Sequence, residues 1–133
     1  MGKRMNLKLP IYVRLAAILA LLVPALSLAQ MKGDPKAGKA KYDVDCAGCH
    51  GKTGKGDGPA AAALTPKPQD HTDGKVMNSL SDQYLFDIIK KGGVAVKKAP
   101  IMPANEKKLN DQEIWDVIAY IRSLANPPYK PAK

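Results

Sequence analysis

Two thiols and an imidazole stand close together in this sequence, in the stretch Cys46-Ala47-Gly48-Cys49-His50. The spacing C-x-x-C-H is the pattern of covalent haem attachment. Haem carries two vinyl groups on neighbouring pyrrole edges, so thiols on both sides of a two-residue spacer can each form a thioether. The next residue is then held under the iron. The motif therefore predicts one covalent haem c, with Cys46 and Cys49 as attachment points and His50 as the proximal iron ligand.

Three other interpretations compete with haem attachment: a redox dithiol, half of a zinc site, and a chance coincidence. The chain has no other cysteines. A thioredoxin-like dithiol is expected near a βαβ pattern, and the sequence has no strand-helix-strand alternation. A structural zinc site needs four ligands at finger-like spacings, and only His71, in a proline-rich loop, is left as a fourth. We therefore adopt haem attachment as the working interpretation.

The side of the iron opposite His50 needs a second ligand or stays open. Met102 is the first candidate, because it lies in a loop whose flanking prolines limit backbone freedom. A thioether opposite a histidine raises the potential of a cytochrome haem. The alternatives are Met77, His71 and an open site, and an isolated methionine is more often a packing residue. Given the haem motif, we expect Met102 to be the distal ligand.

Residues 1–29 are typical of a cleavable secretory signal. They contain four basic residues and no acidic one, and then the apolar run LAAILALLVPALSLA, which ends in small residues. This run has about 15 residues, whereas a spanning helix needs about 20. A retained membrane anchor is the alternative. We expect cleavage near Ala29 and no stable membrane insertion afterwards.

The charge of the chain argues against some classes of partner. The chain has 21 basic and 12 acidic residues, and removal of residues 1–29 leaves 17 basic and 12 acidic residues, a net charge of +5. A dedicated nucleic-acid binder would need a concentrated basic face with aromatic residues, so we expect no nucleic-acid partner. A mildly basic surface suits an acidic protein partner.

Three segments carry the start signals of helices. The first begins at Asp34 as N-cap, with Pro35 in the first helical position, and is expected to run to about residue 45. Segments 80–91 and 109–124 begin with nearly the same pattern, a leucine followed by a polar cap and apolar residues. The last segment has an apolar stripe at helical spacing. These helices would deliver and cover the haem motif.

The segment 51–74 predicts a loop. Four glycines in eight positions allow positive φ angles and a close backbone approach to another group. A phosphate loop is the rival interpretation, but G-x-x-x-x-G-K-[ST] is not satisfied. One short helical turn is expected within residues 59–64, and His71 is expected to be a surface loop residue.

Large apolar side chains are scarce outside the predicted secretory signal, residues 1–29. The chain has one phenylalanine and one tryptophan. The faces of a buried haem would supply apolar surface for the aliphatic side chains to pack against. The protein without haem is therefore expected to be poorly folded.

The chain resembles the class I c-type cytochromes from about Gly33 to Leu124. The resemblance rests on the haem motif, the methionine loop and three helical positions: Gly38, Tyr42 and Tyr120. In that family the first and last helices cross at the glycine and pack through the aromatic residues. The resemblance implies an all-α cytochrome c fold, three to four short helices wrapped around one covalently bound haem. It also implies haem attachment outside the cytoplasm, and hence a periplasmic location.

The expected organisation is a signal peptide over residues 1–29, a monohaem domain over residues 30–126, and a mobile tail over residues 127–133. The domain is expected to be monomeric. It would act as a one-electron carrier between respiratory or dehydrogenase partners and not as an enzyme. The alternatives are a haem subunit of a larger membrane-associated redox complex, and a ligand-binding or peroxidase-like haem protein with an open sixth position.

Redox partners with acidic docking surfaces would be oriented by lysines near the haem edge. The candidates are Lys52, Lys55, Lys97 and Lys98. Each of them is equally well explained as a residue that only solvates its loop, since exposed charge pairs contribute little on average.

Overall fold

The computed structural model describes residues 33–130, so the predicted signal segment 1–29 lies outside the described residues. Within residues 33–130 the secondary structure is helical, apart from one isolated bridge between Asp73 and Asn126. The helices are α2 (Pro35–Asp45), α3 (Ala47–His50), η1 (Ala61–Ala63), α4 (Gly74–Met77), α5 (Asp82–Lys91), η2 (Gly93–Val96) and α6 (Asp111–Leu124). The all-α prediction is confirmed.

The three longer helices, α2, α5 and α6, begin where the sequence predicts. At the start of α2, the Asp34 side chain accepts a hydrogen bond from the main-chain N–H of Lys36 at 2.8 Å. In α5, Ser81 caps the N–H of Tyr84. In α6, Asn110 and Glu113 form a reciprocal capping box. These caps satisfy N–H groups that have no partner inside the helix.

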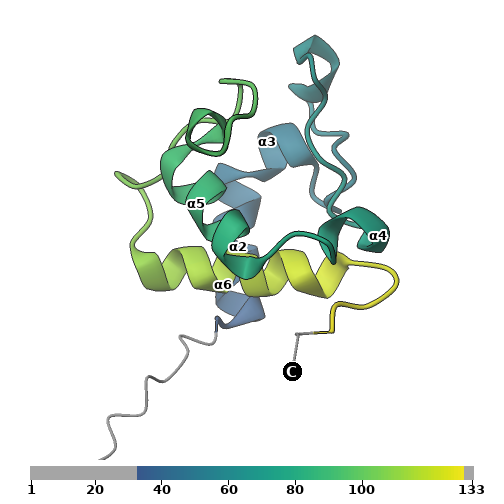
Figure 1. The fold of residues 1–133 in the computed structure, drawn as a ribbon, viewed down its shortest axis with the longest axis vertical. Helices are drawn as coiled ribbons and strands as arrows, with labels where there is room; N and C mark the ends of the chain where they lie inside the picture. The colour runs from purple at the N-terminus through teal and green to yellow at the C-terminus, as the bar shows by residue number, and fades with distance from the viewer. Residues whose placement is uncertain (1–32, 131–133) are drawn as a thin grey trace, which may run out of the picture. The chain divides into compact units, whose positions relative to one another are not determined.

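Helices α2 and α6 cross in close contact, and Figure 1 shows α6 running across the molecule with α2 behind it. A Cβ added to Gly38 would overlap the main-chain carbonyl of Asp116. The absence of a side chain at Gly38 therefore allows the two backbones to approach. Next to the crossing, the rings of Tyr42 and Tyr120 meet edge to face, with their centroids 5.0 Å apart. The expected crossing at Gly38 is confirmed.

The apolar core lies where α5 and the segment before it meet α6. Its largest fully buried side chains come from α2, α4 and α6: Tyr42, Met77, Ile114 and Val117. Helix α5 adds Leu85 and Ile89. Partly buried apolar side chains pack against this core, among them Cys46, Met102 and Trp115. In Figure 1, α5 and the segment that follows it lie on one side, and α3 with the loop after it lies on the other.

The sequence did not predict α4, which falls at the end of the segment expected to be a loop. Asp73 caps it by accepting from the N–H groups of Lys75 and Val76. Ala61–Ala63 form the short turn that was expected within residues 59–64. The glycine-rich part of the segment has positive φ angles at three glycines, Gly51, Gly54 and Gly56, as expected.

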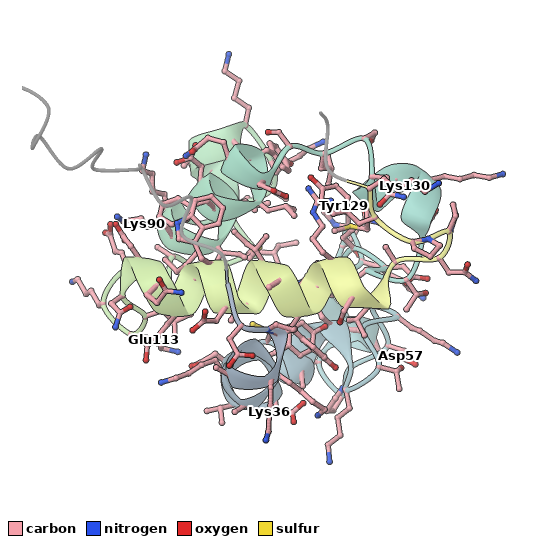
Figure 2. All side chains as sticks on the ribbon, turned by 90° about the horizontal axis from the view of Figure 1, so that it is seen from below. Lys36, Asp57, Lys90, Glu113, Tyr129 and Lys130 are labelled. Atoms are coloured by element: carbon pink, nitrogen blue, oxygen red, sulfur yellow. The ribbon has the colours of Figure 1, made fainter. Side chains whose placement is uncertain are left out.

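A buried arginine ties α6 to the segment between α4 and α5. Arg122 is 7% exposed, and its guanidinium donates to the main-chain carbonyls of Met77 and Leu80 and to the Asp82 carboxylate. The ring of Tyr129 lies against the guanidinium, 3.9 Å from ring centroid to Cζ. Figure 2 shows Tyr129 and Lys36 on opposite sides of α6.

The described part of the expected mobile tail makes contacts with the body of the domain. Besides the Tyr129 contact, the Asn78 side chain donates to the main-chain carbonyl of Pro127 at 3.1 Å. The last three residues, 131–133, lie outside the described residues.

Candidate haem site

The haem motif forms a single helical turn at the end of α2. Cys46 closes α2, since its N–H donates to the carbonyl of Tyr42 at 2.9 Å, and the same residue is the N-cap of α3. His50 ends α3, and its N–H donates to the carbonyl of Cys46 at 2.9 Å. Both cysteines are free thiols and half-buried. The predicted attachment residues therefore lie together on one rigid turn.

A main-chain carbonyl restrains the orientation of the His50 ring. Its Nδ1 lies 3.0 Å from the carbonyl oxygen of Gln69. A carbonyl can only accept, so Nδ1 carries the proton and Nε2 keeps its lone pair. Burial lowers the pKa of His50, which the Gln69 hydrogen bond partly opposes. The result is a neutral imidazole with Nε2 available, which is the form that binds metals.

His71 is not the surface residue that the sequence predicts. It is 7% exposed. Its main-chain N–H donates to the carbonyl of Gly54 at 2.7 Å, and its Nδ1 lies 3.2 Å from the hydroxyl of Tyr42. Its ring stacks on that of His50, with centroids 4.3 Å apart and planes inclined by 18°. The turns of the preceding glycine-rich segment allow this chain to fold inwards, and the prediction of a surface position was wrong.

Burial has a consequence for the charge of His71. Its pKa is lowered to about 3, mainly because burial disfavours the charged ring. His71 is therefore neutral at physiological pH.

Met102 lies in the segment after η2, partly buried against the core. Its main-chain carbonyl accepts from the N–H of Gly93 at 3.0 Å, which ties the segment back to the end of α5. Met77, the other methionine considered, is 1% exposed and belongs to the core. Met102 is therefore more exposed than Met77.

Asn105 is a buried residue of this segment that the sequence analysis did not single out. It is 6% exposed. Its side-chain amide donates to the carbonyls of Ile89 at 3.1 Å and Pro103 at 3.3 Å. Its main-chain N–H donates to the carbonyl of Lys90 at 3.1 Å. Asn105 therefore fastens the end of the Met102 segment to the last turn of α5.

The donor atoms present fit a covalent haem. Two free thiols share one helical turn, an imidazole offers Nε2, and a thioether lies in a segment packed on the core. Apolar, partly buried side chains surround the same core, including Leu80, Phe86 and Ile88. Histidine and methionine are the axial residues of c-type cytochromes with raised potential.

Comparison with known proteins agrees with this chemistry. The family model described as Cytochrome c matches residues 35–125. This chain belongs to the cytochrome c family. A curated relative, cytochrome c-554(547) of Halothiobacillus neapolitanus, is 33% identical over 94 residues, which make up 69% of this chain and 98% of the relative. As a cytochrome c, the chain carries covalently bound haem c with its iron.

Solved structures similar to this cytochrome share its fold. A c-type cytochrome, KustC0563, matches with a TM-score of 0.53 and 20% identity, over 66% of this chain and 96% of that one. A reducing HAO-like protein complex of Kuenenia stuttgartiensis matches with a TM-score of 0.58 and 21% identity, over 77% of this chain and 50% of that one. Among residues 33–130 of this cytochrome, no helix has the length and apolarity needed to cross a bilayer.

Proposed function

We propose that this cytochrome is a one-electron carrier in which Cys46 and Cys49 form the haem thioethers and His50 and Met102 are the axial ligands. The observation that carries the proposal is the hydrogen bond from His50 Nδ1 to the Gln69 carbonyl, beside two free thiols on the same turn. That bond leaves Nε2 free for iron and makes the imidazole a better donor.

The proposed ligands suit electron transfer without chemical change of a substrate. When bound, haem supplies an iron that alternates between the ferric and ferrous states. Two protein ligands that stay in place keep the reorganisation small. Met102 would favour the reduced state, since methionine opposite histidine raises the potential. The Gln69 carbonyl and the Asn105 contacts hold the segments that carry the two ligands.

His71 is a less suitable distal ligand than Met102. Its ring stacks face to face on that of His50, so it would lie on the same side of the haem as the proximal imidazole. This supports a thioether in the sixth position, and Met102 is the thioether whose segment is held by Asn105 next to the core.

Lysines on two loops are proposed to orient acidic redox partners. Lys52, Lys55, Lys97 and Lys98 are exposed. Between residues 33 and 130, none of these four pairs with a carboxylate. Free basic side chains raise association rates with acidic partners and make those rates fall with salt.

A periplasmic location with cleavage near Ala29 is part of the proposal. It rests on the signal-like segment 1–29 and on the family's covalent haem. Fractionation of the producing cells and mass spectrometry of the purified protein test it. Recovery of the intact segment 1–29 from the membrane fraction would contradict cleavage.

The axial ligands are tested by the absorption spectrum of the oxidised protein. Ferric haem with a methionine ligand has a weak charge-transfer band in the far red. We expect this band in the wild type and its loss in Met102→Ala, with Met77→Leu as the matched control that keeps it. A wild type without the band that binds carbon monoxide readily when reduced would indicate an open site and overturn the simple carrier.

A haem subunit of a larger redox complex is the second candidate. It is favoured by one finding, that a solved structure with this fold is a reducing HAO-like protein complex. Native mass measurement of the protein from its own cells distinguishes the two. A monomer mass supports the soluble carrier, whereas a stable larger assembly with other subunits supports the second candidate.

A further inference from the structure

One face of the His50 imidazole is covered by a second imidazole. The His71 ring lies 4.3 Å away between centroids and is nearly parallel, at 18°. The hydrogen bond from Nδ1 to the Gln69 carbonyl acts at one edge of the His50 ring. An imidazole held to a metal through Nε2 can still turn about that bond. The edge hydrogen bond resists this rotation, because Nδ1 lies off the bond axis, and a flat neighbour on the face of the ring adds a second restraint.

His71 is itself fixed at both ends. Its main-chain N–H donates to the carbonyl of Gly54 at 2.7 Å, and its ring Nδ1 lies 3.2 Å from the Tyr42 hydroxyl. The next turn is tightened by Thr72, whose N–H and hydroxyl both donate to the carboxylate of Asp70. His71 therefore cannot move away from His50 without breaking several buried contacts.

The anchor of His71, Tyr42, belongs to the buried contact between α2 and α6. Tyr42 is 0% exposed and lies on α2, four residues from the Gly38 crossing. Its ring packs edge to face against Tyr120 of α6 and against His71, with centroids 5.0 Å and 5.8 Å away. A continuous chain of contacts thus runs from the α2–α6 crossing to the face of His50.

We propose that His71, held by Tyr42, is a positioning residue that, together with the Gln69 carbonyl, sets the plane of the His50 imidazole. The proposal rests on the proposed function, because it takes His50 as the proximal ligand. Partners outside the ligand shell are known to orient metal ligands and tune the metal. The direction of the imidazole plane decides how the ligand's π orbitals meet the d orbitals of iron, and so it shapes the magnetic anisotropy of the ferric state.

The test compares two substitutions in the haem-loaded protein. His71→Phe keeps a flat ring over His50, whereas His71→Leu removes it. The readouts are the g-values of the ferric protein by electron paramagnetic resonance and the spread of haem methyl shifts by proton NMR. We expect His71→Leu to change both beyond the small change in His71→Phe. Tyr42→Phe, which removes only the hydroxyl, should change them in the same direction by less.

A control separates positioning from loss of stability. Asn110→Ala removes an exposed helix cap at the other end of α6 and should leave the g-values and methyl shifts unchanged. If His71→Leu does not yield folded haem protein, the comparison of Tyr42→Phe with Asn110→Ala decides the matter. The leucine variant could fail to fold while Tyr42→Phe and His71→Phe both keep the g-values and methyl shifts of the wild type. That result would assign His71 a purely structural role and overturn the proposal.

Failure of the proposed function gives a different result. A wild-type protein that lacks both the far-red methionine band and the low-spin signals would show that the assignment of His50 and Met102 as axial ligands is wrong. A wild type with both, and a His71→Leu protein with unchanged g-values and shifts, would overturn only the role of His71.

Discussion

Hydrogen bonds to main-chain carbonyls hold both candidate axial ligands or the segments that carry them. His50 is oriented by the carbonyl of Gln69, and Asn105 holds the Met102 segment by donating to the carbonyls of Ile89 and Pro103. Such bonds fix a segment whatever the side chain of the acceptor residue is. Removing the donor of a buried pair leaves the acceptor without a partner, which costs about 1–3 kcal/mol.

Asn105→Ala is expected to loosen the segment that carries Met102, because alanine keeps the main-chain bonds of residue 105 but loses the side-chain bonds to Ile89 and Pro103. An added imidazole should then displace Met102 more easily. If the substitution lowers the stability of the Met102-bound segment by about 1.4 kcal/mol, the apparent affinity for imidazole rises about tenfold. Titration of the ferric protein, followed by the far-red band, measures this. Asn110→Ala is the matched control, and equal effects in both variants would contradict the role given to Asn105.

At the scale of elements, the α2–α6 pair is the frame of the domain. Close approach at Gly38, the Tyr42–Tyr120 contact and an ion pair between Lys41 and Glu113 at 2.6 Å all join these two helices. Figure 2 shows Glu113 at the N-terminal end of α6, on the side where α2 lies. Backbone approach is the least adaptable of these contacts, because a carbonyl in a helix cannot move aside alone.

Gly38→Ala is predicted to destabilise the haem protein. Alanine gains about 1 kcal/mol of helix propensity over glycine, but its Cβ would overlap the Asp116 carbonyl and force the helices apart. We expect a net loss of about 2 kcal/mol, measured by chemical unfolding. Ala40→Val, at an exposed position of the same helix, should cost at most about 0.7 kcal/mol. A stabilised Gly38→Ala protein would contradict the close crossing.

Glu113 is predicted to make the contact between α2 and α6 less stable at acidic pH. The Lys41 ammonium, and next the Asn110 N–H, lower the pKa of Glu113 below its ordinary value of 4.5. A carboxylate with a lowered folded-state pKa stabilises the fold above its unfolded pKa, and the stabilisation is lost as pH falls through the folded pKa.

The corresponding measurement is unfolding of wild type and Glu113→Gln from pH 7 to pH 3. The wild type should be more stable at pH 7, and the difference should shrink below about pH 4.5. Glu106→Gln, at an exposed glutamate that forms no ion pair within residues 33–130, serves for comparison. A difference that grows on acidification would show that the sign of the Glu113 shift is wrong.

At the scale of the whole molecule, haem completes a core that the chain alone supplies sparsely. Among residues 33–130, the largest fully buried side chains are Tyr42, Met77, Ile114 and Val117. Several large apolar groups, such as Phe86 and Trp115, remain only partly buried around them. The faces of a porphyrin would add apolar surface for the chain to bury, and such burial is the main favourable contribution to folding.

The double variant Cys46→Ser/Cys49→Ser is expected to lose covalent haem and most of its helix content. Haem staining after denaturing electrophoresis and far-ultraviolet circular dichroism measure the two effects. The single variants, each with one thioether, should keep more helix than the double variant. A haem-free double variant with full helix content and cooperative unfolding would show that the chain folds without haem.

The sequence predicted the longer helices and the covalent haem better than the placement of its loops. Caps such as Asp34 and Asn110 are local signals, and the haem motif is a short pattern, so both can be recognised without the fold. His71 and Asn105 carry no such signal, because their burial depends on contacts with distant residues, Tyr42 and Ile89. Gln69 takes part through its main chain, so its residue type could not have revealed its role.

The junction of α2 and α3 has a consequence for length variation among proteins of this kind. Cys46 both closes α2 and opens α3, and eight positions separate it from Gly38. Each residue turns a helix by about 100°. One inserted residue would therefore swing the cysteines away from the core while Gly38 still faced α6. Insertions after Gly58 leave the register between Gly38 and Cys46 untouched, so we expect changes of length to be least tolerated between Gly38 and Cys46.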